Sequence, residues 1–320
     1  MFALTYSANG SPDVLTYQEL PDPTPGPGEI LVRNEAIAIE GGDVLLRQMY
    51  PPPAPNHVVG YSSAGTIAGL GEGVDGFTVG QKVAVFGHEG SHASLRVVRA
   101  CEAWAVPNGL EIGSAACVAV AFGTAQEALF AHGRLAEGET VMLQGAAGGV
   151  NMAAMQLAKA AGARVIGTGS SVAQLDALRS YGLDDGIVYP TETLREQVLE
   201  LTGGKGVELA IDPVGGAMLD QVISCTAEQG RIVLVGGSSR EKSLMDAVQL
   251  VLGDRTMSGF MLGKAFHTPR VHAMVAGLLD RMAAGELAAV IDRSFPLSDG
   301  AAAHAYAQTR GRIGRIILIP

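Results

Sequence analysis

Residues 140–169 constrain the fold of this chain more than any other stretch. An apolar run at residues 140–144 leads into a glycine-rich turn, a helical pattern follows, and a second apolar run occupies residues 164–168. Segments in this order predict a strand, a tight turn, a helix and a second strand, which is the unit that binds dinucleotides. The alternative interpretation is a glycine-rich turn that only packs a helix against a sheet and binds no nucleotide. In such a unit, backbone amides and the positive end of the helix dipole face a pyrophosphate. The predicted contacts are Gly145, Ala147, Gly148, Gly149 and Val150.

Asn151 stands where the dinucleotide fingerprint places its last glycine. That glycine normally permits close packing of the helix on the strand. A larger side chain there could push the helix outward or fill a gap beside the small neighbours Ala146 and Ala147. Alternatively, its amide could form a hydrogen bond near the cofactor. The sequence leaves both interpretations open, together with a loss of nucleotide binding.

The end of the second predicted strand indicates which nucleotide is bound. Sites that prefer NAD place an acidic residue there, about 20 residues beyond the glycines, to accept a hydrogen bond from the ribose 2′-hydroxyl. Residues 167–172 contain no acid, and Ser170 and Ser171 can donate hydrogen bonds to a 2′-phosphate. The sequence therefore predicts NADPH as the cofactor.

Strands and helices alternate over the second half of the chain. Further apolar runs occur at residues 186–189, 207–211 and 231–235, with helical periodicity between them. This alternation predicts right-handed crossovers and a parallel sheet with helices on both faces, with the cofactor at the carboxyl ends of the strands. Those ends carry Gly145, Gly169, Asp212 and Gly236.

Turn signals dominate the chain up to about Pro107. Short apolar runs at residues 30–33, 63–68 and 82–86 lie between segments rich in glycine and proline. Short strands broken by turns at this spacing predict a compact β-barrel-like domain. Near the C-terminus we predict a helix at residues 272–285 and a closing strand at residues 314–320 that returns to the first domain.

Charge and composition exclude several classes of partner. A formal net charge of −10 without a basic stripe argues against nucleic acid. The chain contains no run of roughly 18 to 20 apolar residues, and its start lacks signal-peptide features, so we expect a soluble cytoplasmic protein without a membrane partner. We interpret Cys101, Cys117 and Cys225 as three free thiols that serve as small buried core residues.

His88, Glu89 and His92 match the His-Glu-x-x-His pattern of zinc peptidases. That chemistry requires both histidines on one face of a helix, with the glutamate acting on a zinc-bound water. Gly90 and Ser91 lie between them and a strand-like run follows, which favours two histidines in a turn or at a cleft edge.

Several motifs in one order resemble the zinc-independent quinone oxidoreductase branch of the medium-chain dehydrogenase/reductase superfamily. They are residues 25–32, 71–84, 145–150, 212–216 and 314–318. The resemblance implies an α/β protein with a GroES-like β-rich catalytic domain at residues 1–118, a Rossmann domain with a doubly wound parallel sheet at 119–257, and a return to the catalytic domain at 258–320. It implies hydride transfer from NADPH to a quinone or an α,β-unsaturated carbonyl compound, and a homodimer formed through the Rossmann domain. Zinc relatives carry Gly-His-Glu where this chain has Gly60, Tyr61 and Ser62, so we expect no metal.

The same resemblance suggests residues for the chemistry. Tyr50 could donate a hydrogen bond or a proton to the acceptor oxygen, or lie at the domain seam. Asp43 and Arg47 could form an ion pair on one helical turn or act in catalysis. Glu40 stands where relatives often have asparagine, and the spacing from Arg47 to Tyr50 is one residue short, which leaves the substrate pocket open.

Further cofactor contacts are implied in the second domain. Thr124 matches a threonine beside the nicotinamide, or else packs a helix, and Tyr189 matches a tyrosine near the adenosine phosphate, or else is a core residue. Gln174 replaces a basic residue that is common among relatives in the helix after Ser171. The segment expected to close around the nicotinamide comprises Val235, Gly236 and Gly237.

Three functions remain possible. A small, uncharged, conjugated acceptor is favoured because Met49, Tyr50 and the prolines after them suggest an apolar pocket without a cluster of cations. An enoyl-thioester reductase would need a basic entrance for a phosphopantetheine arm. A nucleotide-binding protein with little catalysis, such as a redox sensor or a crystallin-like relative, is the third possibility, because Asn151 and Glu40 depart from the family pattern.

Overall fold

The computed structural model describes residues 1–320, which form two compact units. The first unit comprises Met1–Gly123, Leu262–Thr309 and Gly314–Pro320, and the second comprises Thr124–Met261 and Arg310–Ile313. No helix combines the length and the apolar character needed to span a membrane.

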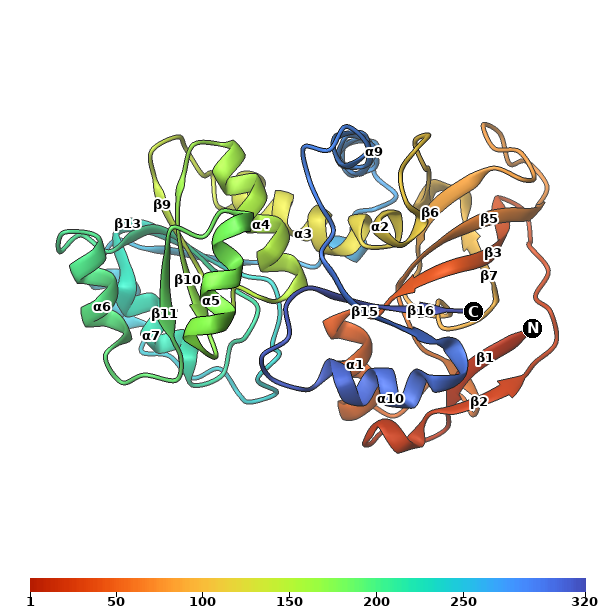
Figure 1. The fold of residues 1–320 in the computed structure, drawn as a ribbon, viewed down its shortest axis with the longest axis horizontal. Helices are drawn as coiled ribbons and strands as arrows, with labels where there is room; N and C mark the ends of the chain where they lie inside the picture. The colour runs from red at the N-terminus through yellow and green to blue at the C-terminus, as the bar shows by residue number, and fades with distance from the viewer. The chain divides into compact units, whose positions relative to one another are not determined.

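The second unit is built on a parallel sheet of six strands in the order β11-β10-β9-β12-β13-β14. Helices α4 and α5 lie on one face of this sheet, and α6 and α7 lie on the other (Figure 1). Successive strands are therefore added on one side of β9 up to β11 and on its other side from β12 onwards. A cofactor binds outside the carboxyl ends of the strands at such a switch point. The elements are β9 (Thr140–Leu143), α4 (Gly149–Ala160), β10 (Arg164–Gly169), α5 (Val172–Leu178), β11 (Asp185–Val188), α6 (Leu194–Leu201), β12 (Val207–Asp212), α7 (Met218–Cys225), β13 (Thr226–Leu234), α8 (Val248–Leu252) and β14 (Thr256–Gly259).

The core of the second unit explains why its strands are almost continuously apolar. Met142, Ile166, Ala210 and Ile232, from four neighbouring strands, pack together with residues of the covering helices. Both faces of the sheet are covered, and each large apolar side chain that is fully buried stabilises the fold by about 1.5–3 kcal/mol. The five strands predicted in this region are all present.

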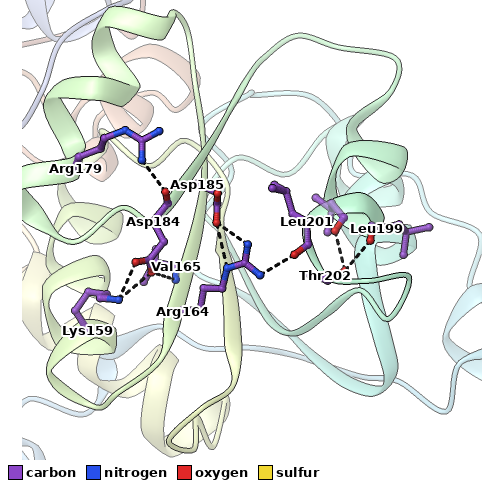
Figure 2. Close-up of polar contacts among 10 residues, drawn as sticks. Lys159, Arg164, Val165, Arg179, Asp184, Asp185, Leu199, Leu201 and Thr202 are labelled. Atoms are coloured by element: carbon purple, nitrogen blue, oxygen red, sulfur yellow. Dashed lines mark hydrogen bonds and ion pairs between the residues drawn. The ribbon is translucent and has the colours of Figure 1, made fainter.

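Ion pairs tie the amino ends of β10 and β11 to the surrounding helices, at the end of the sheet opposite the predicted cofactor site (Figure 2). Asp184 accepts hydrogen bonds from Lys159 Nζ at 2.9 and 3.0 Å and from the backbone N–H of Val165 at 2.7 Å. Arg164 pairs with Asp185 at 2.8 Å and donates to the carbonyl of Leu201, in the last turn of α6, at 2.7 Å. A cation at a helix C-terminus is favoured by the helix dipole.

The first unit is β-rich. Its main sheet has seven strands in the order β15-β16-β3-β5-β6-β8, with β7 pairing with β3, and a three-stranded sheet has the order β2-β1-β4. The elements are β1 (Phe2–Tyr6), β2 (Thr16–Glu19), β3 (Glu29–Ala38), α1 (Gly41–Met49), β4 (His57–Val58), β5 (Ser62–Leu70), β6 (Lys82–Phe86), β7 (Leu95–Arg99), β8 (Ala103–Ala105), α2 (Ile112–Ala116), α9 (Pro269–Ala283), β15 (Ile291–Pro296), α10 (Gly300–Ala307) and β16 (Arg315–Ile319). Helix α3 (Gly123–Gln126) lies at the boundary between the two units.

Long-range pairing completes the first unit. Strand β16 pairs with β3 through Ile317 and Ala38, so the C-terminal strand joins the sheet that the N-terminal part of the chain begins. Helix α9 begins at Pro269, earlier than predicted, because Thr268 caps it and Pro269 suits the first helical position. The cysteine prediction is wrong in one case, because Cys101 is exposed, whereas Cys117 and Cys225 are buried.

Candidate functional site

The glycine turn after β9 has the geometry of a phosphate cradle. Gly145 adopts a φ of 70°, a left-handed conformation that favours glycine, and Gly148 is the N-cap of α4. A Cβ atom at Gly148 would lie 3.3 Å from the carbonyl oxygen of Gly145, so any other residue would crowd the turn. No side chain caps the start of α4, so its first backbone N–H groups can bind an anion, and the turn fits the pyrophosphate of a dinucleotide.

The burial of the turn separates residues that can meet a ligand from residues that build the turn. Ala146 and Asn151 are fully buried. The five predicted contacts all keep exposed surface: Gly145, Ala147, Gly148, Gly149 and Val150.

Asn151 contacts the turn itself. Its Nδ2 donates to the carbonyl of Gln144 at 2.6 Å and to that of Gly145 at 3.4 Å, while its Oδ1 is buried and accepts no hydrogen bond. Asn151 is fully buried, which agrees with the interpretation that it fills a gap, and its side chain also makes polar contacts. The polar contact that the alternative predicted exists, and it is made to the backbone of the phosphate turn.

Thr168, near the end of β10, holds the same turn from its other side. The backbone N–H of Gly145 donates to Thr168 Oγ1 at 2.8 Å, and this hydroxyl donates to Gln144 Oε1 at 3.0 Å. The N–H of Ala146 donates to the carbonyl of Thr168 at 2.8 Å. A single side chain on the neighbouring strand thus fixes the entry into the turn.

The end of β10 carries the hydroxyl groups expected near a 2′-phosphate. Ser170 and Ser171 are exposed, and no acidic side chain lies between β10 and α5. Ser171 caps α5 by accepting from the N–H of Gln174 at 3.2 Å, so its own O–H is not used by the cap. Ser170 Oγ donates to Gln174 Oε1 at 3.0 Å.

Gln174 also brings a distant segment to this place. Its Nε2 donates to the carbonyl of Arg312 at 2.7 Å, and Arg310–Ile313 belongs to the second unit although α10 and β16 on either side belong to the first. The segment holds Arg310 and Arg312, the cations that α5 lacks. Sequence reasoning missed them because they follow Gln174 by more than a hundred residues.

The other predicted cofactor residues of the second unit lie as follows. Thr124 is the first residue of the second unit and is half-buried. Tyr189 follows β11 and packs partly buried against the core of the unit, with its N–H donating to the carbonyl of Gly169 at 2.7 Å. The residues that follow β13 all keep exposed surface: Val235, Gly236 and Gly237.

Asp212 at the end of β12 shapes the neighbouring loop. Its Oδ1 accepts from the N–H groups of Val214 at 2.7 Å and Gly215 at 3.0 Å, and its Oδ2 is buried without a hydrogen-bond partner. Burial raises the pKa of this carboxyl group, against the opposing effect of the two backbone donors.

In the first unit, α1 begins in a cluster of buried charges. Asp43 Oδ2 accepts from the N–H of Glu40 at 2.8 Å, as in a capping box. Glu40 is 3% exposed and forms an ion pair with Arg315 of β16 at 2.5 Å. Burial raises the pKa of both carboxyl groups, and the Glu40 charge raises that of Asp43 further. The partner of Glu40 therefore comes from the far end of the chain.

The remaining candidates in the first unit differ in accessibility. Arg47 is fully buried and donates to the carbonyl of Gly10, whereas Tyr50, just beyond α1, is 56% exposed. The ion pair of Asp43 with Arg47, and a direct role of either in catalysis, stay predictions. Tyr61, which sequence reasoning treated only as a missing zinc ligand, is half-buried against Gly42 of α1, and burial and the nearby Asp43 carboxyl raise its pKa.

The two histidines of the peptidase-like motif do not share a helix. They lie in the loop between β6 and β7, where His88 packs edge-on against Phe86. Their place in a loop agrees with the expectation of histidines in a turn, and the full burial of His92 excludes the cleft-edge alternative for that residue. Its Nε2 lies 3.0 Å from Nε2 of His304 in α10, and its Nδ1 lies 3.0 Å from Ser91 Oγ. No group of three or more His, Cys, Asp or Glu side chains is arranged to hold a metal ion.

A GroES-like unit joined to a doubly wound sheet with this phosphate turn defines a medium-chain dehydrogenase/reductase. Two family profiles match accordingly: one described as alcohol dehydrogenase GroES-like domain over residues 26–137, and one described as zinc-binding dehydrogenase over residues 149–283. A quinone oxidoreductase of Pseudomonas aeruginosa is 32% identical over 321 residues, 99% of each chain. The chain belongs to the zinc-independent quinone oxidoreductase branch of this superfamily.

Further relatives agree on the class of activity. A 2-haloacrylate reductase of Burkholderia is 30% identical over 333 residues, covering 100% of this chain and 99% of the relative. The crystal structure of Escherichia coli quinone oxidoreductase in complex with NADPH has a TM-score of 0.94 and 28% identity, with 100% of both chains covered. This protein is an NADPH-dependent oxidoreductase.

Proposed function

We propose that this oxidoreductase reduces a quinone or another small, uncharged α,β-unsaturated carbonyl compound and that it does so without zinc. The observation that carries the proposal is the pair Tyr61 and Ser62, which stand where the zinc-containing relatives have histidine and glutamate. Quinone and 2-haloacrylate, named for two relatives of nearly full length, both have a carbon–carbon double bond conjugated to a carbonyl group, and of the two only the quinone is uncharged.

The cofactor residues are assigned from the cradle and its neighbours. We assign the pyrophosphate to Gly145 and the amides at the start of α4, and the 2′-phosphate to Ser170, Ser171 and the arginines of the Arg310–Ile313 segment. Tyr189 is assigned to the adenosine end. The nicotinamide end is assigned to Thr124, Val235, Gly236 and Gly237.

Reduction of a conjugated carbonyl compound places negative charge on the carbonyl oxygen, and NADPH supplies the hydride when it is bound. Without a metal, this charge must be met by hydrogen-bond donors. We assign this role to the Tyr50 hydroxyl, which is accessible, and name Tyr61 as a second donor because it is half-buried against Gly42 of the same helix, α1. Buried Asp43 and Arg47 support α1 in this assignment.

A panel of acceptors tests the proposal. NADPH oxidation is measured with 1,4-benzoquinone, an enone, 2-chloroacrylate and crotonyl thioester, and metal content is determined on the purified protein. We expect turnover with the quinone or the enone, and no stoichiometric zinc. Turnover confined to the thioester would favour an enoyl-thioester reductase. NADPH binding without any turnover would favour a noncatalytic sensor or crystallin-like protein. Either result contradicts the proposal.

We also propose that the protein forms a homodimer through the second unit. Strand β14 is the last strand of the parallel sheet, so one of its edges is unpaired. Just before it in sequence, Val251 and Leu252 of α8 are 78% and 79% exposed, and exposed apolar side chains beside an unpaired strand edge are typical of an interface. Sedimentation of the wild type should show a dimer. Leu252→Asp should convert the dimer to a monomer, whereas the exposed control Val172→Asp should leave the dimer intact.

We place the protein in the cytoplasm, because its three free thiols suit a reducing compartment.

A further inference from the structure

Asn151 occupies a glycine position, and one of its two hydrogen bonds to the phosphate turn, at 2.6 Å, is shorter than the 2.8 Å contact that Thr168 makes there. It lies in the first turn of α4, is fully buried, and donates from Nδ2 to the carbonyls of Gln144 and Gly145 at 2.6 and 3.4 Å. These are the two residues with which the chain leaves β9 and enters the turn. A glycine at this position could make neither contact.

The direction of these two carbonyl groups matters for an anion. A pyrophosphate is favoured by N–H groups that point towards it and disfavoured by carbonyl oxygens that do the same. Asn151 holds the Gln144 and Gly145 oxygens on the buried side of the turn. Thr168 accepts from the N–H of Gly145 on the neighbouring strand, so the turn is fixed at both its carbonyl and its amide groups.

The unused oxygen of Asn151 distinguishes this role from packing. Its Oδ1 is buried without a hydrogen-bond partner, which carries a free-energy cost that an apolar side chain such as alanine would avoid. Only the Nδ2 end of the side chain is satisfied, and both of its contacts go to the turn. The amide donor is therefore the part of Asn151 that the structure uses.

We propose that Asn151 is a positioning residue that holds the phosphate turn in its binding conformation before NADPH arrives. The proposal rests on the assignment of the pyrophosphate to this turn and is independent of the acceptor. It predicts that the loss of the amide weakens binding of ligands that carry the pyrophosphate, because part of the binding free energy is then used to order the turn.

Calorimetric titration of the free protein with two probes tests the proposal. NADPH contains the pyrophosphate, whereas adenosine 2′-monophosphate reports only on the 2′-phosphate and adenine end. For Asn151→Ala and Asn151→Gly we expect the Kd of NADPH to rise about three- to tenfold, in keeping with the loss of one hydrogen bond, while the Kd of adenosine 2′-monophosphate stays constant. Asn151→Asp keeps the shape and adds negative charge beside the phosphates, so its loss should be larger.

A second measurement does not depend on any ligand. In the cofactor-free protein, hydrogen exchange at residues 145–150 should be faster in Asn151→Ala than in the wild type, while the control Ala160→Gly, at the other end of α4, leaves it unchanged. If a variant at position 151 fails to fold, Thr168→Val releases the turn from its other side and should raise the Kd of NADPH in the same selective way.

Three results would overturn the proposal: an unchanged or lower Kd of NADPH in Asn151→Gly, an equal weakening of both probes, or unchanged exchange in the turn. Its failure is separable from that of the proposed function. A wild-type protein that binds NADPH but reduces none of the acceptors refutes the proposed function and leaves the Asn151 experiment intact.

Discussion

At the scale of single residues, two tyrosines of the first unit divide the proposed chemistry between them. Tyr50→Phe removes an accessible hydroxyl, and Tyr61→Phe removes a half-buried one. Loss of a donor to the developing oxyanion should lower kcat/KM with the quinone about tenfold or more, with the Kd of NADPH unchanged. The matched control is Tyr17→Phe, an exposed tyrosine on β2. Wild-type kcat/KM in both variants would exclude these hydroxyls from the reaction.

Glu40 and Arg315 provide a second test, this time of stability. Both side chains are buried and 2.5 Å apart, so Glu40→Ala leaves a buried guanidinium without its carboxylate. Breaking a buried pair in this way costs about 3–5 kcal/mol of unfolding free energy, measured by urea titration. The control Glu286→Ala breaks the more exposed pair with Arg281 and should cost less than about 1 kcal/mol. Similar losses in the two variants would contradict the role assigned to Glu40.

These residues also show what sequence can reveal about a site. The phosphate turn is predictable because its glycines, its strand and its helix are neighbours in the chain. Glu40 finds Arg315 only through the pairing of β16 with β3, and neither residue type indicates that partner. The spacing of Asp43 and Arg47 suggests a local pair because the two residues are close in sequence, and the same closeness lets Asp43 accept from the N–H of Glu40 at the helix start.

At the scale of elements, the proposed 2′-phosphate site includes the short connection between α10 and β16. Gln174 binds the backbone of Arg312, which places two arginines in the unit that holds the phosphate turn. Hydrogen bonds to a charged phosphate contribute about 1.5–3 kcal/mol. Arg310→Ala combined with Arg312→Ala should therefore raise the Kd of NADPH by roughly 10-fold or more and leave that of NADH unchanged. The control Arg195→Ala lies on α6, and an equal effect on both nucleotides would remove these arginines from the 2′-phosphate site.

The sequence predicts those elements whose pattern depends on residues close together in the chain. The strands of the parallel sheet are predictable because burial on both faces makes them continuously apolar. The motif of His88 and His92 is misleading as a pattern, because the spacing suits a helix and the chain forms a loop there. The exposure of Cys101 follows from its place in a short turn after β7, which composition does not reveal.

At the scale of the whole molecule, the buried pair of His92 and His304 links stability to pH. Burial lowers the pKa of both rings, that of His304 to about 3, and the neighbouring His304 lowers that of His92 further. Both histidines are therefore neutral in the folded protein near pH 7. In the unfolded chain each should regain an ordinary pKa of about 6.5. Above about pH 6.5 the histidines are neutral in both states and do not reduce the free energy of unfolding. As the pH falls below about 6.5 the free energy of unfolding decreases, because the unfolded chain takes up protons that the folded protein does not bind.

The size of this effect can be stated and tested. Between pH 7.5 and 5.5, each histidine should lower the free energy of unfolding by about 1.4 kcal/mol, as each binds close to one proton only when unfolded. Urea titrations at the two pH values give the change in the free energy of unfolding for each protein. This change should be about 3 kcal/mol larger in the wild type than in the double variant His92→Asn, His304→Asn. His267→Asn, which alters a histidine outside this pair, is the control. If the double variant loses as much stability as the wild type over this range, the histidines are protonated in the folded protein, and the neutral Nε2 contact of 3.0 Å does not describe it.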